Sequence, residues 1–350
     1  MLVFLIARVP NAKGCAKGLE KMGHTLDSIA KELGMSKTTV SRAISGKGRI
    51  SEETRRKVNE YIKEINYSPS AVARSLAANR TFNVGLVFPA DSALGEMPYF
   101  QTLMTGVCDR AIDFEYDVLI ILADNDGILP LKHAVQNKKI DAVIVSRCEK
   151  DSKVINFLKQ CDIPYIVVGN PMDPEVPYVD HDNEGATSRM IETLIDAGIK
   201  KMALIGGGEN INVTLRRLQG FKNGFKNKGL PVDESLIFLN MHKSVRLDSV
   251  LKEALAEGAE CIVCMDDMLC NSVLNCLHND GISVPEDVKL CSFYDSNLLS
   301  TSKPSVTSLY FDAKKLGALG LELLMRNLDG ESIANQTLKD FNIQMRDSTT

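Results

Sequence analysis

From Phe82 to about residue 330, short apolar runs alternate with stretches that carry the apolar spacing of helices. The apolar runs are 84–88, 117–122, 141–145, 164–168, 201–206, 235–239, 260–264 and 287–293. The helical stretches are at about 100–114, 130–137, 151–160, 183–197, 215–228, 245–257, 267–279 and 311–327. Strands that are apolar on both faces and alternate with helices predict parallel sheets covered on both sides. Because about 240 residues exceed what one sheet usually holds, we expect two α/β lobes.

Charge is distributed unevenly along the 350-residue chain, whose formal net charge is −4. Residues 22–80 contain eleven Lys and Arg against six Asp and Glu, a balance of +5, and residues 1–21 add +3. Residues 81–350 therefore carry −12. A basic N-terminal unit on an acidic body is typical of nucleic-acid binding, although a solvated helix surface gives the same counts.

Three short helices are predicted between residues 25 and 65, each introduced by a capping hydroxyl. The predicted N-caps are Thr25, Ser36 and Ser51. The second helix leaves short polar side chains and one arginine outward, and such groups can contact phosphates and base edges. Two short helices joined by a tight turn and braced by a third predict a helix-turn-helix. The alternative is a three-helix bundle without a ligand.

A fourth helical pattern, residues 70–78, follows Pro69, a residue that suits a helix start. It is too short to be stable alone in water. Its position between two folded units makes it a candidate linker that folds conditionally, and a plain tether is the alternative.

Several classes of protein are disfavoured. No apolar run approaches the ~20 residues that span a bilayer, and the apolar start of the chain lacks the basic region of a signal peptide. We take Met22 as the expected native start and residues 1–21 as a non-native or disordered extension. Nine cysteines without an export signal predict reduced thiols in the cytoplasm. Cys261 and Cys264 lie three apart in an apolar strand, so they face opposite sides and are expected to be buried rather than metal-bound.

The body offers little support for an enzyme. Its Gly206-Gly207-Gly208 run fails as a dinucleotide fingerprint because Ile211 stands where the last glycine is needed. There is no phosphate-binding lysine loop, no nucleophile elbow and no metal spacing among the five histidines. We therefore expect no enzymatic activity, no cofactor and no metal.

Polar residues instead follow the predicted strands, where ligands bind in parallel sheets. They are Asp182-Asn183, Arg216-Arg217, Asp266-Asp267 and Asp295. Together they suit a hydroxyl-rich or charged small molecule, although each by itself is more often a loop residue.

The stretch TLDSIAKELGMSKTTVSRAISGKGRISEETRRKVNEYIKEINYSPSAVARSLA, residues 25–77, resembles the DNA-binding and hinge region of LacI/GalR-family transcription regulators. The motifs on which this resemblance rests are S-K-T-T-V-S-R, N-Y-S-P and A-R-S-L-A. The body is similar more loosely, through M-P-Y-F (97–100), D-N (182–183), R-L-Q-G-F (217–221), M-D-D-M (265–268), V-P-E-D-V (284–288) and F-Y-D (293–295). The chain departs from the family pattern at Ser45, Ser70 and Asp266, which leaves contact details and the effector class open.

The resemblance implies an N-terminal all-α helix-turn-helix domain (22–67) and a hinge helix with its linker (68–80). These join a two-lobed α/β effector-binding and dimerisation domain with parallel sheets (81–345), like that of periplasmic sugar-binding proteins. The implied N-lobe is about 81–180 plus 297–325, and the C-lobe is about 181–296 plus the C-terminal segment. The implied protein is a homodimer and most often a repressor. It reads a roughly palindromic DNA operator and is controlled by a small-molecule effector, without a membrane partner.

The resemblance also implies site residues. The implied DNA-contacting residues are Thr25, Ser36, Lys37, Thr38, Thr39, Ser41, Arg42, Tyr67, Ala73 and Leu76. Of these, Lys37, Thr38 and Arg42 would read bases, and Leu76 would wedge between base steps. The implied effector-binding residues are Phe100, Asp182, Arg217, Asp267 and Asp295. Sugars, sugar acids and sugar phosphates remain open as effectors, as do induction and co-repression. Two rival classes are a DNA-binding domain fused to a sugar kinase or isomerase, and a solute-binding protein for import.

Overall fold

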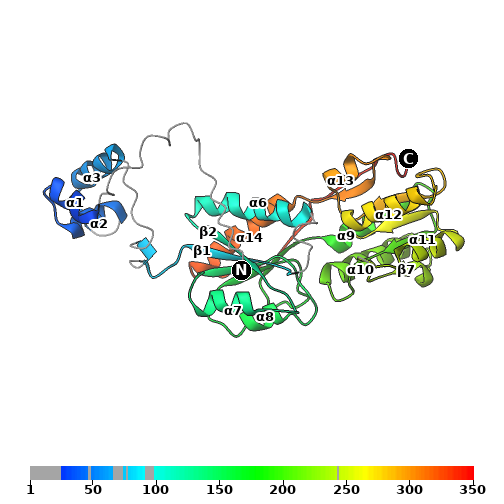
Figure 1. Ribbon diagram of the computed structural model, residues 1–350, viewed down its shortest axis with the longest axis horizontal. Coiled ribbons are helices and arrows are strands. Elements are labelled where there is room, and N and C mark those ends of the chain that lie inside the picture. The colour runs from blue at the N-terminus through cyan, green and yellow to red at the C-terminus, as the bar shows by residue number, and fades with distance from the viewer. Residues whose placement is uncertain (1–24, 46–48, 66–73, 76–77, 91–97, 243) are drawn as a thin grey trace. The chain divides into compact units, whose positions relative to one another are not determined.

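The computed structural model describes residues 25–45, 49–65, 74–75, 78–90, 98–242 and 244–350 (Figure 1). The chain divides into an N-terminal unit that ends at Thr81 and a body from Phe82 to Thr350. We describe each unit by itself. None of the helices in the described ranges is both long and apolar enough to cross a membrane.

The N-terminal unit consists of α1 (Leu26–Glu32), α2 (Lys37–Ser45) and α3 (Glu52–Glu64). Its small core is built from the side chains that the helical spacing places inward: Ile29, Ala30, Val40, Ala43 and Val58. The predicted caps are confirmed. Thr25 Oγ1 accepts the Ser28 amide at 3.2 Å while Ser28 Oγ accepts the Thr25 amide at 2.9 Å, which together form a capping box.

The N-lobe is a six-stranded parallel sheet in the order β11-β5-β4-β3-β1-β2. Its strands are β1 (Asn83–Phe88), β2 (Asp117–Leu122), β3 (Ala142–Val145), β4 (Tyr165–Val168), β5 (Tyr178–His181) and β11 (Gln336–Leu338). Its helices are α6 (Pro98–Asp113), α7 (Leu129–Gln136), α8 (Lys153–Leu158) and α14 (Ala313–Leu328). Helices α6 and α14 cover one face, and α7 and α8 cover the other (Figure 1).

The C-lobe is a second six-stranded sheet, in the order β12-β10-β9-β8-β6-β7. Its strands are β6 (Met202–Ile205), β7 (Ile237–Phe238), β8 (Cys261–Cys264), β9 (Lys289–Ser292), β10 (Thr307–Tyr310) and β12 (Asn342–Gln344), the last antiparallel to β10. Its helices are α9 (Asn183–Asp196), α10 (Asn212–Asn227), α11 (Leu247–Ala256), α12 (Asp267–Asn279) and α13 (Asn297–Ser300). The predicted two-lobed α/β fold is confirmed.

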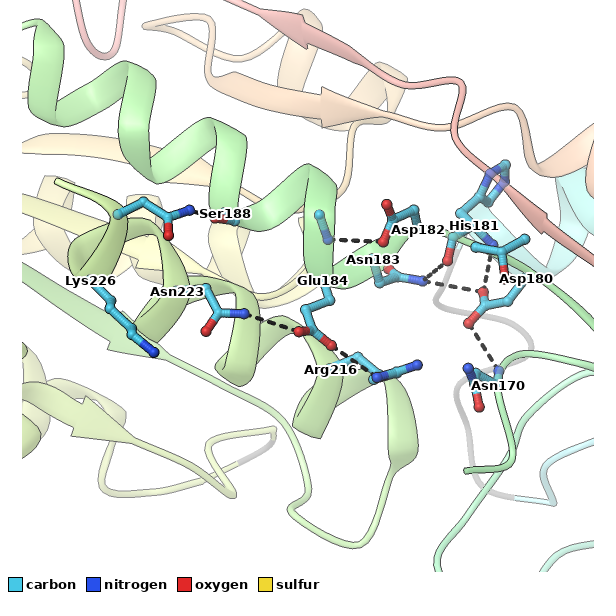
Figure 2. A pocket seen from close by; sticks show the side chains of 13 residues that line it. Asn170, Asp180, His181, Asp182, Asn183, Glu184, Ser188, Arg216, Asn223 and Lys226 are labelled. Carbon is cyan, nitrogen blue, oxygen red and sulfur yellow. Dashed lines mark hydrogen bonds and ion pairs between the residues drawn. The ribbon is translucent and has the colours of Figure 1, made fainter. Parts of the chain in front are cut away.

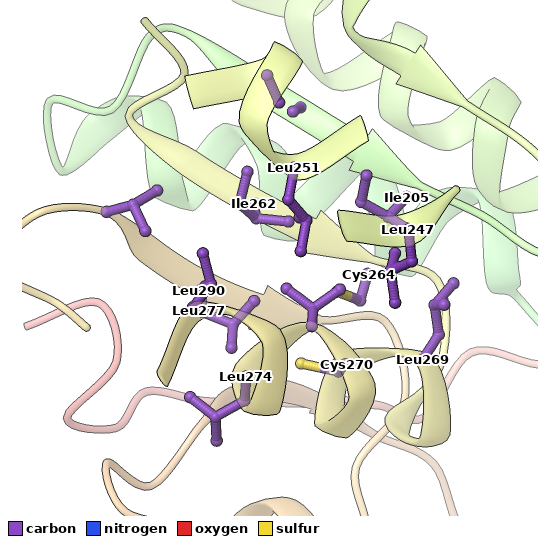
Figure 3. Close-up of a cluster of buried hydrophobic side chains, with 14 of the residues drawn as sticks. Ile205, Leu247, Leu251, Ile262, Cys264, Leu269, Cys270, Leu274, Leu277 and Leu290 are labelled. Carbon is purple, nitrogen blue, oxygen red and sulfur yellow. The ribbon is translucent and has the colours of Figure 1, made fainter. Parts of the chain in front are cut away.

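Both faces of the C-lobe sheet are buried, as the apolar strand runs predict. Figure 3 shows Leu247 and Leu251 of α11 on one side of strand β8 and Leu274 and Leu277 of α12 packed nearby. Cys264 lies in this cluster, whereas Cys261 lies in the cluster beneath α9 and α10. The prediction that the two thiols face opposite sides of the strand is therefore confirmed.

The chain crosses between the lobes three times, at residues 181–183, 310–313 and 338–342. The predicted N-lobe segment 297–325 is wrong in its first part, because α13 and β10 belong to the C-lobe. Strand β10 was missed because its sequence, TSLY, is polar. The first three residues of β10 are nevertheless buried. Burial of the Thr307 hydroxyl is tolerated because Thr307 Oγ1 shares a hydrogen bond with Thr349 Oγ1 at 2.6 Å.

One helix pair in each lobe packs backbone against backbone at glycines. A Cβ atom at Gly106 of α6 would lie 2.0 Å from the carbonyl oxygen of Lys314 in α14. A Cβ at Gly220 of α10 would lie 2.3 Å from the Glu184 carbonyl oxygen of α9. Each lobe therefore carries a tightly packed helix pair that tolerates no side chain at the contact.

Candidate functional site

Helix α2 presents a continuous polar surface. Lys37, Thr38, Ser41 and Arg42 are all exposed. Positions i, i+1, i+4 and i+5 of a helix lie on one side, so these four side chains share a surface. They offer cations and hydroxyl groups, which are the donors that contact DNA phosphates and base edges. Of the ionic contacts on this surface, Lys37 Nζ lies 2.8 Å from Asp27 Oδ2 of α1, a pair that is exposed and therefore weak.

Three other predicted DNA contacts have local structural roles. Thr25 caps α1, and Ser36 Oγ accepts the amide of Thr39 at 3.1 Å at the start of α2. Ser36 Oγ and Thr39 Oγ1 also share a hydrogen bond of 2.8 Å. Such hydroxyls position the turn between α1 and α2.

The remaining predicted DNA contacts, Tyr67, Ala73 and Leu76, lie outside the described residues. Within the predicted hinge, Arg74, Ser75 and Ala78 have helical backbone.

The body contains a cleft of about 130 Å³ between the two lobes. Its lining residues are Tyr99, Phe100, Ser146, Arg147, Cys148, Val168, Gly169, Asn170, Asp180, His181, Asn183, Ile211, Asn212, Val213, Thr214, Arg217, His242, Met265, Asp266, Asp267, Tyr294 and Phe311. They come from strand ends of both sheets and from two of the three crossings. The cleft therefore lies where parallel sheets bind ligands.

Direct contacts join the lobes beside the cleft. Glu149 and Ile211 form an antiparallel β-bridge, and the Lys150 amide donates to the Asn210 carbonyl at 2.7 Å. We call the contact between these four residues the interlobe bridge. Across the cleft, the rings of Tyr99 and Tyr294 meet edge to face at 5.5 Å. Both contacts depend on the angle between the lobes.

Arg217 on α10 is the central cation of the cleft. Its Nε donates to Asn183 Oδ1 at 3.1 Å, and its Nη1 donates to the Met265 carbonyl. Burial lowers the pKa of the guanidinium, which the nearby Asp266 and Asp180 partly oppose. In the described part of the chain no carboxylate lies within ion-pair distance of Arg217. A buried cation without an anionic partner is suited to a ligand.

Three carboxylates line the cleft in different states. Asp180 accepts hydrogen bonds from the amides of Asn170 and His181 at 2.9 and 2.7 Å, yet burial raises its pKa to about 6. Burial also disfavours the charge of Asp266, but the hydrogen bond from His242 Nε2 at 2.8 Å and other contacts outweigh it and lower the pKa.

The third carboxylate, Asp267, is buried at the start of α12, and burial raises its pKa. Its Oδ2 atom has no hydrogen-bond partner. Asp267 therefore offers a free acceptor inside the cleft.

The structure brings together three of the five predicted effector residues: Phe100, Arg217 and Asp267 all line the cleft. Asp295 does not. Arg346 binds its carboxylate through both terminal nitrogens, at 2.7 and 2.9 Å, and Ser308 Oγ donates to it at 2.6 Å. Its oxygens are therefore occupied within the C-lobe.

Asp182 also lies outside the cleft lining. Its Oδ1 accepts the Gly185 amide at 2.9 Å and so caps α9. It lines a neighbouring cavity of about 460 Å³, which we call the flank pocket (Figure 2). Figure 2 shows Lys226 at one end of this pocket and Asn170 and Asp180 at the other. Between them Glu184 pairs with Arg216 at 2.9 Å.

Sequence reasoning missed several cleft residues. Ser146 and Arg147 follow β3, so the rule that polar residues after strands form the site could have found them. Asp180 and His181 were missed because the strand YVDH carries polar residues and was not predicted. Nothing in the sequence pattern marks His242. Among the described side chains, no group of three or more His, Cys, Asp or Glu residues could hold a metal ion.

Comparisons with known proteins agree with this geometry. The family model described as "Bacterial regulatory proteins, lacI family" matches residues 25–70. A model described as "Periplasmic binding protein-like domain" matches residues 191–349. Catabolite control protein A of Staphylococcus epidermidis is 30% identical over 318 residues, which cover 89% of this chain and 94% of that protein.

Solved structures show the same fold. A transcriptional regulator CelR–cellobiose complex superposes with a TM-score of 0.70 at 25% identity, covering 93% of this chain and 99% of that one. The lac repressor dimer bound to operator and the anti-inducer ONPF superposes with a TM-score of 0.77 at 20% identity, covering 94% and 99%. The chain belongs to the lacI family of bacterial regulatory proteins, and it is a DNA-binding transcriptional regulator.

Proposed function

We propose that this regulator is a homodimeric repressor whose affinity for a roughly palindromic operator is controlled by a small molecule bound in the cleft. The observation that carries the proposal is Arg217, a buried cation without a carboxylate partner, in a cleft lined by both lobes. A ligand that contacts both lobes has different affinities at different lobe angles, so it shifts the population of those angles. The sugar ligand of the related CelR complex supports a sugar or sugar derivative as the effector.

We assign DNA reading to the surface of α2. Lys37, Thr38 and Arg42 are proposed to read base edges in the major groove, and Thr39 and Ser41 to contact phosphate. The exposure of four of these five side chains supports this assignment. Thr25 and Ser36, which cap helices, would contribute to phosphate contacts from the same end of the unit. Half-sites are expected about one helical turn apart.

The hinge is proposed to transmit the change. Residues 70–78 would fold as a helix on the operator, with Ala73 in the minor groove and Leu76 inserted between base steps. Tyr67 would contact phosphate nearby. A change in lobe angle in the dimer would alter the spacing of the two hinge segments and so favour or oppose their folding.

Within the body, Phe100, Arg217 and Asp267 are proposed to contact the effector directly. Asp182 and Asp295 are proposed to support the site indirectly, since both carboxylates are engaged in structural contacts. We further propose that the bound molecule is not converted. The protein would act in the cytoplasm, where its DNA is accessible.

The test starts from the operator. Selection of genomic fragments by the full-length protein should recover a roughly palindromic sequence, and fluorescence anisotropy then measures its affinity with and without candidate effectors. A sugar or sugar derivative should change the affinity without being consumed. If the protein recovers no common sequence, or if no small molecule changes its affinity for DNA, the proposed function is wrong.

A further inference from the structure

An exposed ion pair joins Asp27 of α1 to Lys37 of α2, on the surface to which DNA reading is assigned. Lys37 Nζ lies 2.8 Å from Asp27 Oδ2, and the two side chains are 59% and 68% exposed. Lys37 is the first residue of α2. In helix-turn-helix proteins the N-terminal residues of the second helix contact base edges, so a carboxylate bound to Lys37 lies within reach of the same bases.

The folding of α1 does not account for Asp27. Thr25 and Ser28 already form the capping box at the start of this helix. Among the described side chains, the ion-pair partner of Asp27 is Lys37 of the next helix and not Lys31, which lies four residues on in α1. An exposed pair of this kind contributes little to stability. A role in binding therefore explains the pair better than a role in folding.

A carboxylate needs a reason to be present on a surface that meets DNA. Residues 22–80 carry a balance of +5, and α2 itself contains no acidic residue. Because DNA phosphates are negative, an exposed carboxylate opposes binding wherever it finds no hydrogen-bond donor. The amino-group donors of the major groove are N4 of cytosine and N6 of adenine. Asp27 therefore penalises DNA sites that lack such a donor, and a repulsive contact of this kind produces specificity.

The spacing of the pair matches one base pair. In G·C, guanine O6 and cytosine N4 lie side by side in the major groove, joined by a hydrogen bond of about 2.9 Å. An ammonium and a carboxylate oxygen 2.8 Å apart can meet both groups at once, the ammonium donating to O6 and the carboxylate accepting from N4. T·A presents thymine O4 and adenine N6 in the same order. Lysine favours guanine, however, because guanine offers two acceptors and thymine offers one beside a methyl group.

The ion pair also prepares the two side chains for this contact. Long side chains lose conformational freedom when they bind, and that loss opposes association. Lys37 is already held by Asp27 in the DNA-free protein, so part of the loss has occurred before DNA arrives. The pair is exposed and weak, so it can adjust to a base pair at little cost.

We propose that Asp27 determines base specificity, and that Asp27 and Lys37 together read one G·C base pair in each half-site, with the lysine on guanine and the carboxylate on cytosine. The proposal rests on the proposed function, because it requires α2 to lie in the major groove. It extends the reading surface from α2 to the first turn of α1.

The experiment compares the base preferences of full-length variants by selection from operator libraries with a randomised half-site. Asp27→Ala should lose the preference for cytosine at one position, where discrimination against other bases falls about five- to tenfold. Asp27→Asn should move that preference from cytosine to adenine, because an amide side chain pairs with adenine N6 and N7. Lys37→Met should relax the preference for guanine in the same base pair.

A second measurement separates base reading from folding. Fluorescence anisotropy with a duplex that lacks the operator gives the non-specific affinity at several salt concentrations. Asp27→Ala and Asp27→Asn should bind this duplex as tightly as the parent or more tightly, because one repulsive charge is gone, while their affinity for the parent operator falls. The matched control is Glu60→Ala, which removes an exposed carboxylate that lies 3.9 Å from Arg56 on α3. It should leave every base preference unchanged.

Three outcomes would count against the proposal. Unchanged preferences in both Asp27 variants, together with one relaxed position in Lys37→Met, would overturn the role of Asp27 and leave base reading by α2 standing. A parent preference for a base other than cytosine at the position that Asp27→Ala relaxes would overturn the G·C assignment. If the parent selects no common sequence, the proposed function is wrong and this proposal falls with it.

Discussion

Replacement of Arg346 by Met removes the partner of a buried carboxylate. Arg346 and Asp295 have side-chain exposures of 18% and 10%, and the guanidinium also donates to the Val306 carbonyl at 2.7 Å. Removing one member of a buried ion pair leaves the other charge uncompensated, which costs about 3–5 kcal/mol. Met fills a similar volume, so the loss should come from the charge rather than from a cavity. For a body of this size the melting temperature should fall by about 10 °C.

Differential scanning calorimetry of the full chain, with Asp295→Asn as the second arm of a double-mutant cycle, tests this estimate. Once Asp295 is Asn, Arg346→Met should cost much less, with a coupling energy of about 2 kcal/mol. Asp295→Asn should also leave sugar affinity within about twofold of the parent, because its oxygens do not line the cleft. A loss below about 1 kcal/mol for Arg346→Met would refute the buried-pair reasoning. A large loss of sugar affinity in Asp295→Asn would instead restore Asp295 as an effector ligand.

Three further predictions follow from the site residues. Arg42→Ala should weaken operator binding by about 1–3 kcal/mol and relax base preference at one position, and an unchanged preference in a binding-site selection would exclude Arg42 from reading. The Arg217→Met variant should bind operator, but the effector should no longer change its operator affinity in fluorescence anisotropy. A variant whose affinity still changes would show that the effector binds elsewhere. The pKa of His181 is about 4 in the folded state and about 6.5 in the unfolded state, so its neutral form contributes stability above pH ~6.5 that is lost as the pH falls toward 4. Asp180, whose pKa is raised to about 6, instead adds stability as the pH falls, but it does so in the parent and the variant alike and cancels in the comparison. The stability of His181→Leu relative to the parent should therefore rise by about 2 kcal/mol between pH 7 and pH 5, and a constant difference in urea unfolding would contradict the assignment.

Local chemistry explains which elements the sequence could predict. The caps of the N-terminal helices depend on residues three apart, as Thr25 and Ser28 show, so the pattern contains all the information needed. Buried strands such as β8 are apolar on both faces and stand out for the same reason. Arg217 and Asp267 line the cleft because polar residues at strand ends and along α10 converge there. Phe100 of α6, which also lines the cleft, was predicted only by the family resemblance.

The misses depend on distant partners. Asp295 follows a strand as a ligand residue would, but Arg346, 51 positions later, takes its carboxylate. Strands β5 and β10 contain polar residues and are largely buried all the same, because partners for their polar groups come from other segments of the chain. Thr349, for example, pairs with Thr307. No window of neighbouring residues contains this information. The place of His181 in the cleft lining is hidden in the same way, since only the fold brings it beside residues that are distant in the sequence, such as Phe311.

The three crossings have a consequence for the synthesis of the protein. Each lobe is assembled from separate parts of the chain, and the N-lobe needs α14 and β11, which begin at Ala313 and Gln336. The ribosome releases these segments only near the end of translation, so the first five strands of the N-lobe form before one of their covering helices is available. A chain that stops before residue 313 lacks the partner of α6 and exposes the apolar face that α14 buries. Premature termination before residue 313 should therefore yield an aggregation-prone chain rather than a shortened regulator.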